Sequence, residues 1–121
     1  MSAPITSIKV TNLVVDCNHL SLVATFWAEL LGHSVSSSEE DWVDLGPLSP
    51  GGPVLSFQRV PEDKAGKNRL HLDLVVPDAV LTGQRARRFG ATAVSGLHKG
   101  AAGPWQVWSD PEGNEFCLIS G

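Results

Sequence analysis

Apolar and polar positions in the first half of the chain predict a strand, a helix and then three strands. Residues 8–16 are largely apolar and β-branched, which indicates a strand, and an apolar stripe of helical period covers 19–31. The stripe consists of Leu22, Val23, Phe26, Trp27, Leu30 and Leu31. Asn18 is the expected N-cap of this helix, and Gly32 is the expected glycine after its last turn. Three short strands are then expected: around Val35, at 42–45 and at 54–58.

The second half repeats this order, so the sequence predicts two βαβββ modules. Residues 70–76 form the expected strand, Asp78 caps a helix over 79–89, and Gly90 ends it. Three strands follow: at 93–94, 105–108 and 115–119, the last two joined as a hairpin by the turn at 110–113. Alignment of the modules equates four sets of residues: Asn12 with His71, Leu31-Gly32 with Phe89-Gly90, Trp42 with Trp105, and Phe57-Gln58 with Phe116-Cys117.

Length and composition limit the classes of protein that this chain can represent. Its 121 residues suffice for one domain over 1–121, with modules at about 5–60 and 69–120, and 42% hydrophobic residues can form a core. A net charge of −4 without a basic stripe argues against nucleic acid or a membrane surface as the main partner. The sequence shows no leader or membrane span, and Cys17 and Cys117 lack a C-x-x-C spacing, so we expect a bacterial-type cytoplasmic protein with free thiols.

Residues 26–32 (FWAELLG), 67–74 (KNRLHLDL) and 110–118 (DPEGNEFCL) together resemble the small glyoxalase-like domains of the vicinal oxygen chelate (VOC) superfamily. This superfamily includes glyoxalase I, extradiol dioxygenases and bleomycin-resistance proteins, and the resemblance covers nearly the whole chain. It implies an α+β fold in which the two βαβββ modules form an open eight-stranded, barrel-like cup with helices outside; a ferredoxin-like sandwich is the alternative. It also implies a small-molecule ligand and a homodimer, since members usually pair modules between chains.

The resemblance also implies where a metal would bind. The superfamily's metal enzymes use four side chains, mostly His and Glu, at positions that correspond here to Asn12, Gln58, His71 and Cys117. Only His71 is a residue type that these enzymes commonly use at its position, so the resemblance implies a degraded metal site. A divalent metal is then the only candidate cofactor, and we expect it to bind weakly. Because side chains alternate along a strand, Asp73 shares a face with His71, as Glu115 does with Cys117. His71 and Glu115 are therefore the candidate metal ligands.

Two hypotheses for the function follow from these residues. The polar face lines either a cavity or open solvent, and the resemblance favours a cavity lined by His71, Asp73, Glu115, Cys117, Asn12, Gln58, Trp42 and Trp105. The favoured hypothesis is a module that binds a small organic molecule without metal and lacks glyoxalase I activity. The alternative is a divalent-metal lyase, isomerase or dioxygenase. A structural interaction domain has no feature in its favour, and motifs for nucleotide binding or serine hydrolysis are absent.

Overall fold

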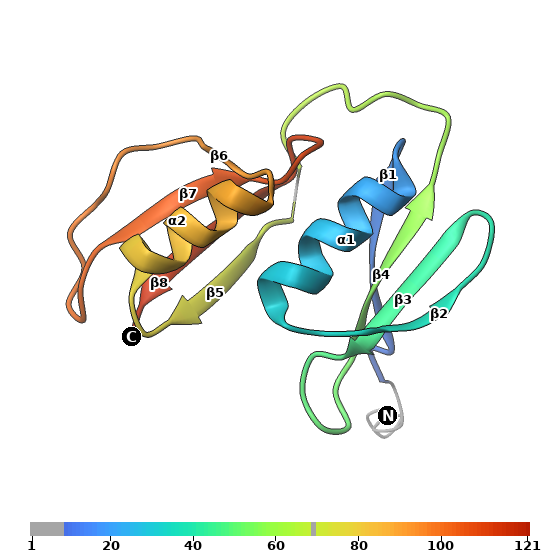
Figure 1. Ribbon diagram of the computed structural model, residues 1–121, viewed down its shortest axis with the longest axis horizontal. Coiled ribbons are helices and arrows are strands. Elements are labelled where there is room, and N and C mark those ends of the chain that lie inside the picture. Colours follow the sequence, from blue (N-terminus) through green and yellow to red (C-terminus); the bar gives the residue numbers. More distant parts are fainter. Residues whose placement is uncertain (1–8, 69) are drawn as a thin grey trace, which may run out of the picture.

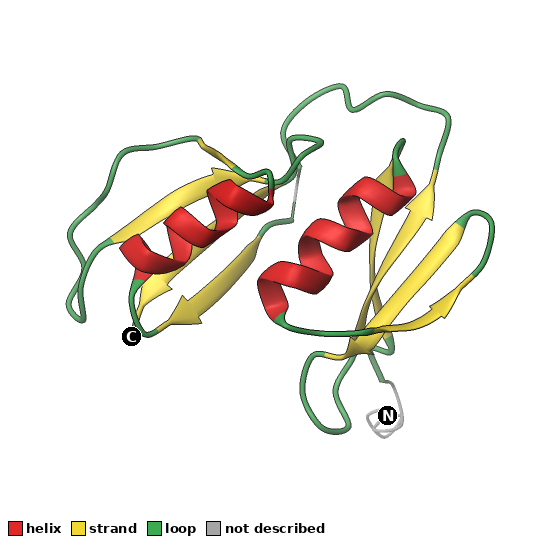
Figure 2. Ribbon diagram, in the orientation of Figure 1, coloured by secondary structure: helices red, strands yellow, loops and turns green. Residues whose placement is uncertain are grey.

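The computed structural model describes residues 9–68 and 70–121, whose helices and strands are shown in Figure 2. The first module comprises β1 (Asn12–Cys17), α1 (Leu20–Leu31), β2 (Val35–Ser38), β3 (Trp42–Pro47) and β4 (Val54–Arg59). The second comprises β5 (Leu72–Val76), α2 (Ala79–Phe89), β6 (Thr92–Ala93), β7 (Trp105–Ser109) and β8 (Glu115–Ser120). The predicted α+β fold with two βαβββ modules is confirmed. The expected module starts, residues 5 and 69, lie outside the described residues.

Each module forms its own four-stranded sheet (Figure 1). The strand orders are β1-β4-β3-β2 and β5-β8-β7-β6, and in each sheet the first and last strands of the module pair in parallel. The other pairs are antiparallel, including the predicted hairpin of β7 and β8. Within the described residues no ladder joins the two sheets, so the eight strands do not close into a barrel. Both helices lie on the same side of the sheets in Figure 1, which leaves the opposite faces free of helices.

The hydrophobic core connects the modules through α1. Phe26 and Trp27 project from this helix with only 1% and 2% of their surface exposed. Their rings lie 5.9 and 5.0 Å from the ring of Phe116 on β8, in tilted and edge-to-face arrangements that are favourable for aromatic pairs. Trp27 is therefore a core residue, as the apolar stripe predicted, and its partner belongs to the other module.

Three of the predicted helix ends are confirmed. Gly32 follows α1 with φ +68°, and Gly90 follows α2 with φ +118°, conformations that glycine adopts without steric strain. The carboxylate of Asp78 caps α2 by accepting hydrogen bonds from two backbone N–H groups of the first turn, at 3.0 and 3.1 Å. Local sequence signals therefore set these three boundaries.

The start of α1 is held differently from the prediction. Asn18 is not the N-cap; its side chain donates hydrogen bonds to the carbonyl oxygens of Val60 and Glu62, at 2.9 and 3.0 Å. Instead, the Glu112 carboxylate of the second module accepts hydrogen bonds from the backbone N–H groups of Asn18 and His19, at 2.8 and 2.6 Å. A carboxylate at a helix N-terminus also interacts favourably with the helix dipole. The second module therefore caps the first helix.

Asp110 makes a second connection between the modules. This residue is 3% exposed, and its Oδ2 atom accepts hydrogen bonds from Trp27 Nε1 at 3.0 Å and Asn114 Nδ2 at 2.8 Å. Its Oδ1 atom accepts from the backbone N–H groups of Glu112 and Asn114, both at 2.9 Å. The turn itself is closed by the Gly113 N–H, which donates to the Asp110 carbonyl at 3.0 Å. The turn at 110–114 thus fixes α1 against the second module.

None of the helices in the described part of the chain is both long and apolar enough to cross a membrane.

Candidate functional site

All eight residues predicted to form the site lie on the helix-free faces of the two sheets. Partners in direct register share a face of a sheet, and Asp73 pairs with Cys117 while Trp42 pairs with Gln58. The first sheet contributes Asn12, Trp42 and Gln58, and the second contributes His71, Asp73, Trp105, Glu115 and Cys117. The alternation of side chains along each strand places them there, but the structure divides them between two separate sheets.

Three of these side chains converge on the second sheet. His71 lies directly before β5, and its Nε2 atom is 3.3 Å from Asp73 Oδ1. A ligand atom of His71, one of Asp73 and the Cys117 sulfur all lie within 4.8 Å of one another. The side chains of His71 and Asp73 are 53% and 56% exposed, so solvent and solutes reach this group, here called the polar trio. It offers an imidazole, a carboxylate and a thiol to a ligand.

The Cys117 thiol is protonated at neutral pH. Burial is the largest cause that raises its pKa above the ordinary value, and the nearby charges of Asp73 and Glu115 raise it further. Lys67 acts in the opposite direction, but more weakly. A thiol in this state is a poor nucleophile, and it becomes a metal ligand only by losing its proton to the incoming ion.

Glu115, the other candidate metal ligand, does not join the polar trio. Its carboxylate lies 3.7 Å from the ammonium group of Lys67, and it is the side chain of Asp73 that completes the group of metal-ligating atoms around His71. The two candidate ligands are therefore separated: His71 belongs to the polar trio, whereas Glu115 forms an ion pair with Lys67 in the segment between the modules.

An apolar surface adjoins the polar trio on the same face of the second sheet. Ile119 pairs in register with Val75 on one side and with Trp105 on the other, which places the three side chains in one row across the strands. Val75 is 69% exposed, and the Trp105 ring stacks on His98 at a centroid distance of 4.3 Å. This row, here called the apolar shelf, lies one pleat beyond the row of Asp73 and Cys117.

The corresponding face of the first sheet is occupied by its own hydrogen bonds. Asn12 Nδ2 donates to Ser56 Oγ at 2.9 Å, and the Ser56 hydroxyl donates to Asp44 Oδ1. Trp42 Nε1 donates to the same carboxylate oxygen at 2.7 Å. The hydrogen bonds that this carboxylate accepts, from Ser56 first and then from Trp42, lower the pKa of Asp44 below its usual range. Asp44 and Ser56 were not predicted, although Asp44 follows Trp42 by two residues and must share its face.

The strand registers correct the predicted alignment of the two modules. Val14 lies in the middle of β1 and pairs with Ser56. At the same position of the second module, Asp73 pairs with Cys117. Cys117 therefore corresponds to Ser56, and its predicted equivalence with Gln58 is wrong by two residues.

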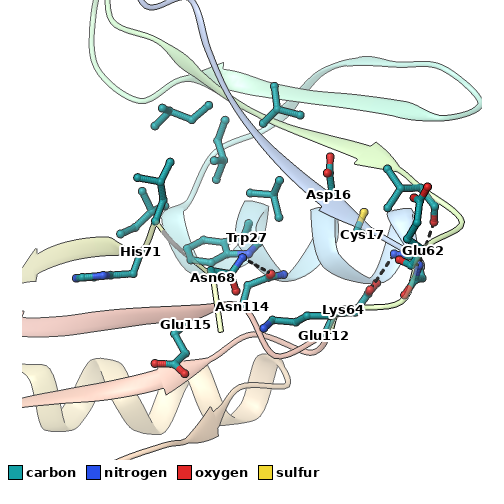
Figure 3. Close-up of a pocket in the computed structure, with 18 of the residues that line it drawn as sticks. Asp16, Cys17, Trp27, Glu62, Lys64, Asn68, His71, Glu112, Asn114 and Glu115 are labelled. Atoms are coloured by element: carbon teal, nitrogen blue, oxygen red, sulfur yellow. Dashed lines mark hydrogen bonds between the residues drawn. The ribbon is translucent and has the colours of Figure 1, made fainter. Parts of the chain in front are cut away.

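A cavity of about 660 Å³ lies between the modules (Figure 3). His71 and Glu115 line it, whereas the other six predicted site residues do not. Its apolar wall includes Leu13 and Leu55 from the helix side of the first sheet, together with Trp27. The cavity is therefore lined by both modules and by the loop that connects them.

Comparison with known proteins identifies the family. Residues 12–119 match the family model described as a glyoxalase-like domain. The chain belongs to the glyoxalase-like domain family. No curated protein matches this glyoxalase-like domain in sequence. The family resemblance expected from the three sequence stretches is thus confirmed.

Solved structures show the same fold at low sequence identity. A glyoxalase/bleomycin resistance protein/dioxygenase family enzyme from Burkholderia phytofirmans PsJN has a TM-score of 0.77 and 15% identity, over 92% of this chain and 97% of that chain. A glyoxalase-related enzyme from Fulvimarina pelagi has a TM-score of 0.74 and 14% identity, over 93% and 88%. The bleomycin-binding protein of Streptomyces verticillus, complexed with copper(II)-bleomycin, has a TM-score of 0.62 and 16% identity, over 97% and 99%.

The donor set of this glyoxalase-like domain fits a divalent ion only in part. The polar trio provides one nitrogen, one carboxylate and one sulfur, a combination that suits zinc better than magnesium or calcium. On the first sheet, Asn12 and Ser56 are already engaged with each other and with Asp44. A metal at this site would be held by His71, Asp73 and Cys117.

Proposed function

We propose that this glyoxalase-like domain binds a small organic molecule on the helix-free face of its second sheet. The observation that carries the proposal is the polar trio lying one pleat away from the apolar shelf, because a few convergent polar groups beside apolar surface are typical of ligand sites. The trio would orient a polar group of the ligand, and the shelf would pack against its apolar part. The copper(II)-bleomycin complex of a structural neighbour supports a small-molecule ligand.

Metal-dependent catalysis is the second candidate function, and the convergence of the polar trio favours it. A divalent ion there would act as a Lewis acid on a substrate oxygen. We place it second because the trio contains a protonated thiol and because, on the first sheet, Asn12 and Ser56 are engaged with each other and with Asp44. A bound metal would then be held weakly, chiefly by His71, and glyoxalase I activity would be absent.

Zinc titration and an NMR fragment screen separate the two functions. Isothermal titration calorimetry with Zn²⁺ tests the metal, and ¹⁵N-labelled protein is screened with a library of aromatic fragments. We expect fragment-induced shifts at residues of β5, β7 and β8, and their loss in His71→Ala. His33→Ala, the same change outside the site, should behave as the wild type. Fragment shifts confined to other surfaces would overturn the proposal, and Zn²⁺ binding tighter than about 1 μM would favour the enzyme instead.

We also propose that two copies of the chain associate. Val14 and Val75 are 45% and 69% exposed on the helix-free faces, and β1 and β5 are edge strands whose outer hydrogen-bonding groups are unpaired in their sheets. Apolar faces and sheet edges of this kind favour association. Light scattering after size exclusion should give twice the chain mass of 12.9 kDa, and Val75→Lys should lower it. A mass near that of a single chain at tens of micromolar would contradict the proposal.

A further inference from the structure

The cavity between the modules has an apolar wall that no part of the sheet site uses. It is lined by Leu13 and Val15 from β1, Leu55 from β4 and Leu72 from β5. Trp27 lines it from α1 (Figure 3). Leu13, Val15 and Leu72 are only partly buried, so the cavity leaves apolar surface in contact with solvent. At about 660 Å³ it has the size of an ordinary small-molecule pocket.

The rim of this cavity is acidic. Asp16, Glu62 and Asp63 line it, and among the described residues their carboxylates take part in no ion pair or hydrogen bond. Glu112 also lines it but is engaged by the start of α1. Lys64 is the one lysine of the described lining, and its ammonium group donates to the carbonyl oxygen of Gly66. Carboxylates still outnumber the ammonium group of Lys64 among the described lining residues, so their net charge is negative.

Hydrogen bonds across the cavity hold its walls in place before any ligand binds. Asn18 links the end of β1 to the loop after β4, and Glu112 links it to the second module. Asn68 Nδ2 donates to Asn114 Oδ1 at 3.1 Å, which ties the connecting loop to the turn before β8 (Figure 3). A preformed pocket binds ligands without the cost of ordering its walls.

We propose that this cavity is a second ligand site, specific for organic amines that carry an apolar body. The ammonium group would lie at the acidic rim to which Asp16, Glu62 and Asp63 contribute, and the apolar body would pack on Trp27 and the aliphatic wall. An anionic analogue would be repelled by the same carboxylates. This site meets the proposed sheet site at His71, which lines the cavity, but Asp73 and Cys117 do not line it.

Three probes with one apolar body and different head groups test the proposal: 4-phenylbutylamine, 4-phenylbutan-1-ol and 4-phenylbutanoate. Affinities are measured by NMR titration of the ¹⁵N-labelled full chain. We expect the amine to bind at least about tenfold more tightly than the carboxylate, a difference of about 1.4 kcal/mol. The indole N–H signal of Trp27, assigned with Trp27→Phe, and the amides of 13–18 should shift. Equal binding of amine and carboxylate, or shifts centred on β7 and β8, would overturn the proposal.

Charge-matched variants show whether the rim itself is responsible. The triple variant Asp16→Asn, Glu62→Gln, Asp63→Asn should weaken amine binding at least about tenfold and leave the alcohol unaffected. The control variant Glu29→Gln, Glu39→Gln, Glu40→Gln removes the same charge outside the lining and should bind the amine as the wild type does. Equal losses in both variants would mean a general surface-charge effect and refute the site. Asp73→Asn should leave amine binding unchanged, so failure of the sheet site is distinguishable from failure of this one.

Discussion

Replacing Asp110 with Asn should destabilise the whole domain, because its carboxylate joins the two modules. The two oxygens accept four hydrogen bonds from Trp27, Asn114 and the backbone of the turn, and the residue is 3% exposed. An Asn side chain has the same shape but only one acceptor oxygen. Its NH₂ group would therefore face two of the four donors, and those donors would lose their partner without access to water.

The size of the effect follows from the number of donors left unpaired. Each buried polar group that loses its partner costs about 1–3 kcal/mol, so two of them should cost about 2–4 kcal/mol after partial relaxation. Domains of this size have a free energy of unfolding of about 5–15 kcal/mol. A loss of about 3 kcal/mol should lower the urea midpoint by about 2 M, for an m-value of about 1.5 kcal/mol/M.

Urea unfolding followed by circular dichroism measures this loss, and a double-mutant cycle assigns it. Trp27→Phe removes one donor and keeps an aromatic ring, so its effect and that of Asp110→Asn should couple by about 1–2 kcal/mol. Asp63→Asn, at an exposed aspartate, should change stability by no more than about 0.5 kcal/mol. If Asp110→Asn were as mild as this control, or if the two changes were additive, the turn would not be the connection between modules.

Three further predictions concern packing, pH and thiol reactivity. Gly83→Ala should cost about 1–3 kcal/mol, since its Cβ would lie 2.6 Å from Cζ2 of the buried Trp108 ring; urea unfolding measures this. Folding lowers the pKa of Asp44, so the ionised carboxylate stabilises the fold above about pH 4. This stabilisation is lost as the pH falls through the pKa of the folded state. Urea unfolding at pH 2–5 should show this dependence, and Asp44→Asn should lack it. Iodoacetamide should modify Cys117 slowly at pH 8, and Asp73→Asn should accelerate the reaction by removing a charge that raises the thiol pKa.

Controls for these predictions lie elsewhere in the chain. Gly66→Ala places its Cβ in open space and should leave stability within about 0.5 kcal/mol of the wild type. Burial raises the pKa of Cys17 to about 11, so this thiol should stay unmodified in the native protein. The packing explanation would be contradicted if Gly83→Ala stabilised the protein. The explanation of the pH dependence would be contradicted if Asp44→Asn kept the wild-type pH profile. Equal alkylation rates of Cys117 in the wild type and in Asp73→Asn would contradict the explanation of the thiol reactivity.

Local signals in the sequence were sufficient for much of the fold. Gly32, Gly90 and Asp78 end or cap their helices through groups within a few residues, so their roles are readable from the sequence itself. The start of α1 depends instead on Glu112, which is 94 positions from Asn18. A polar residue before an apolar stripe predicts a cap, but it cannot show that a distant carboxylate takes over this role.

The alignment error leaves each predicted site residue on the same face of its strand. The error was two residues, and a shift of two along a strand returns every side chain to the same face. His71, Asp73 and Cys117 therefore lie together as alternation along neighbouring strands suggests. The separation of the two sheets, and the cavity beside them, depend on how the modules pack, which the strand pattern does not encode.

The two modules have the same fold but have distributed their polar groups differently. On the first sheet, Ser56 is completely buried and its hydroxyl bridges Asn12 and Asp44. At the same position of the second sheet, Cys117 carries a weak hydrogen-bonding thiol, and its neighbours His71 and Asp73 are more than half exposed. Polar groups that satisfy one another have little capacity left for a ligand, whereas exposed donors and acceptors exchange water for a ligand at low cost. Asn12, Ser56 and Asp44 of the first face therefore contribute to stability, and this contrast is why we propose the ligand site on the second face.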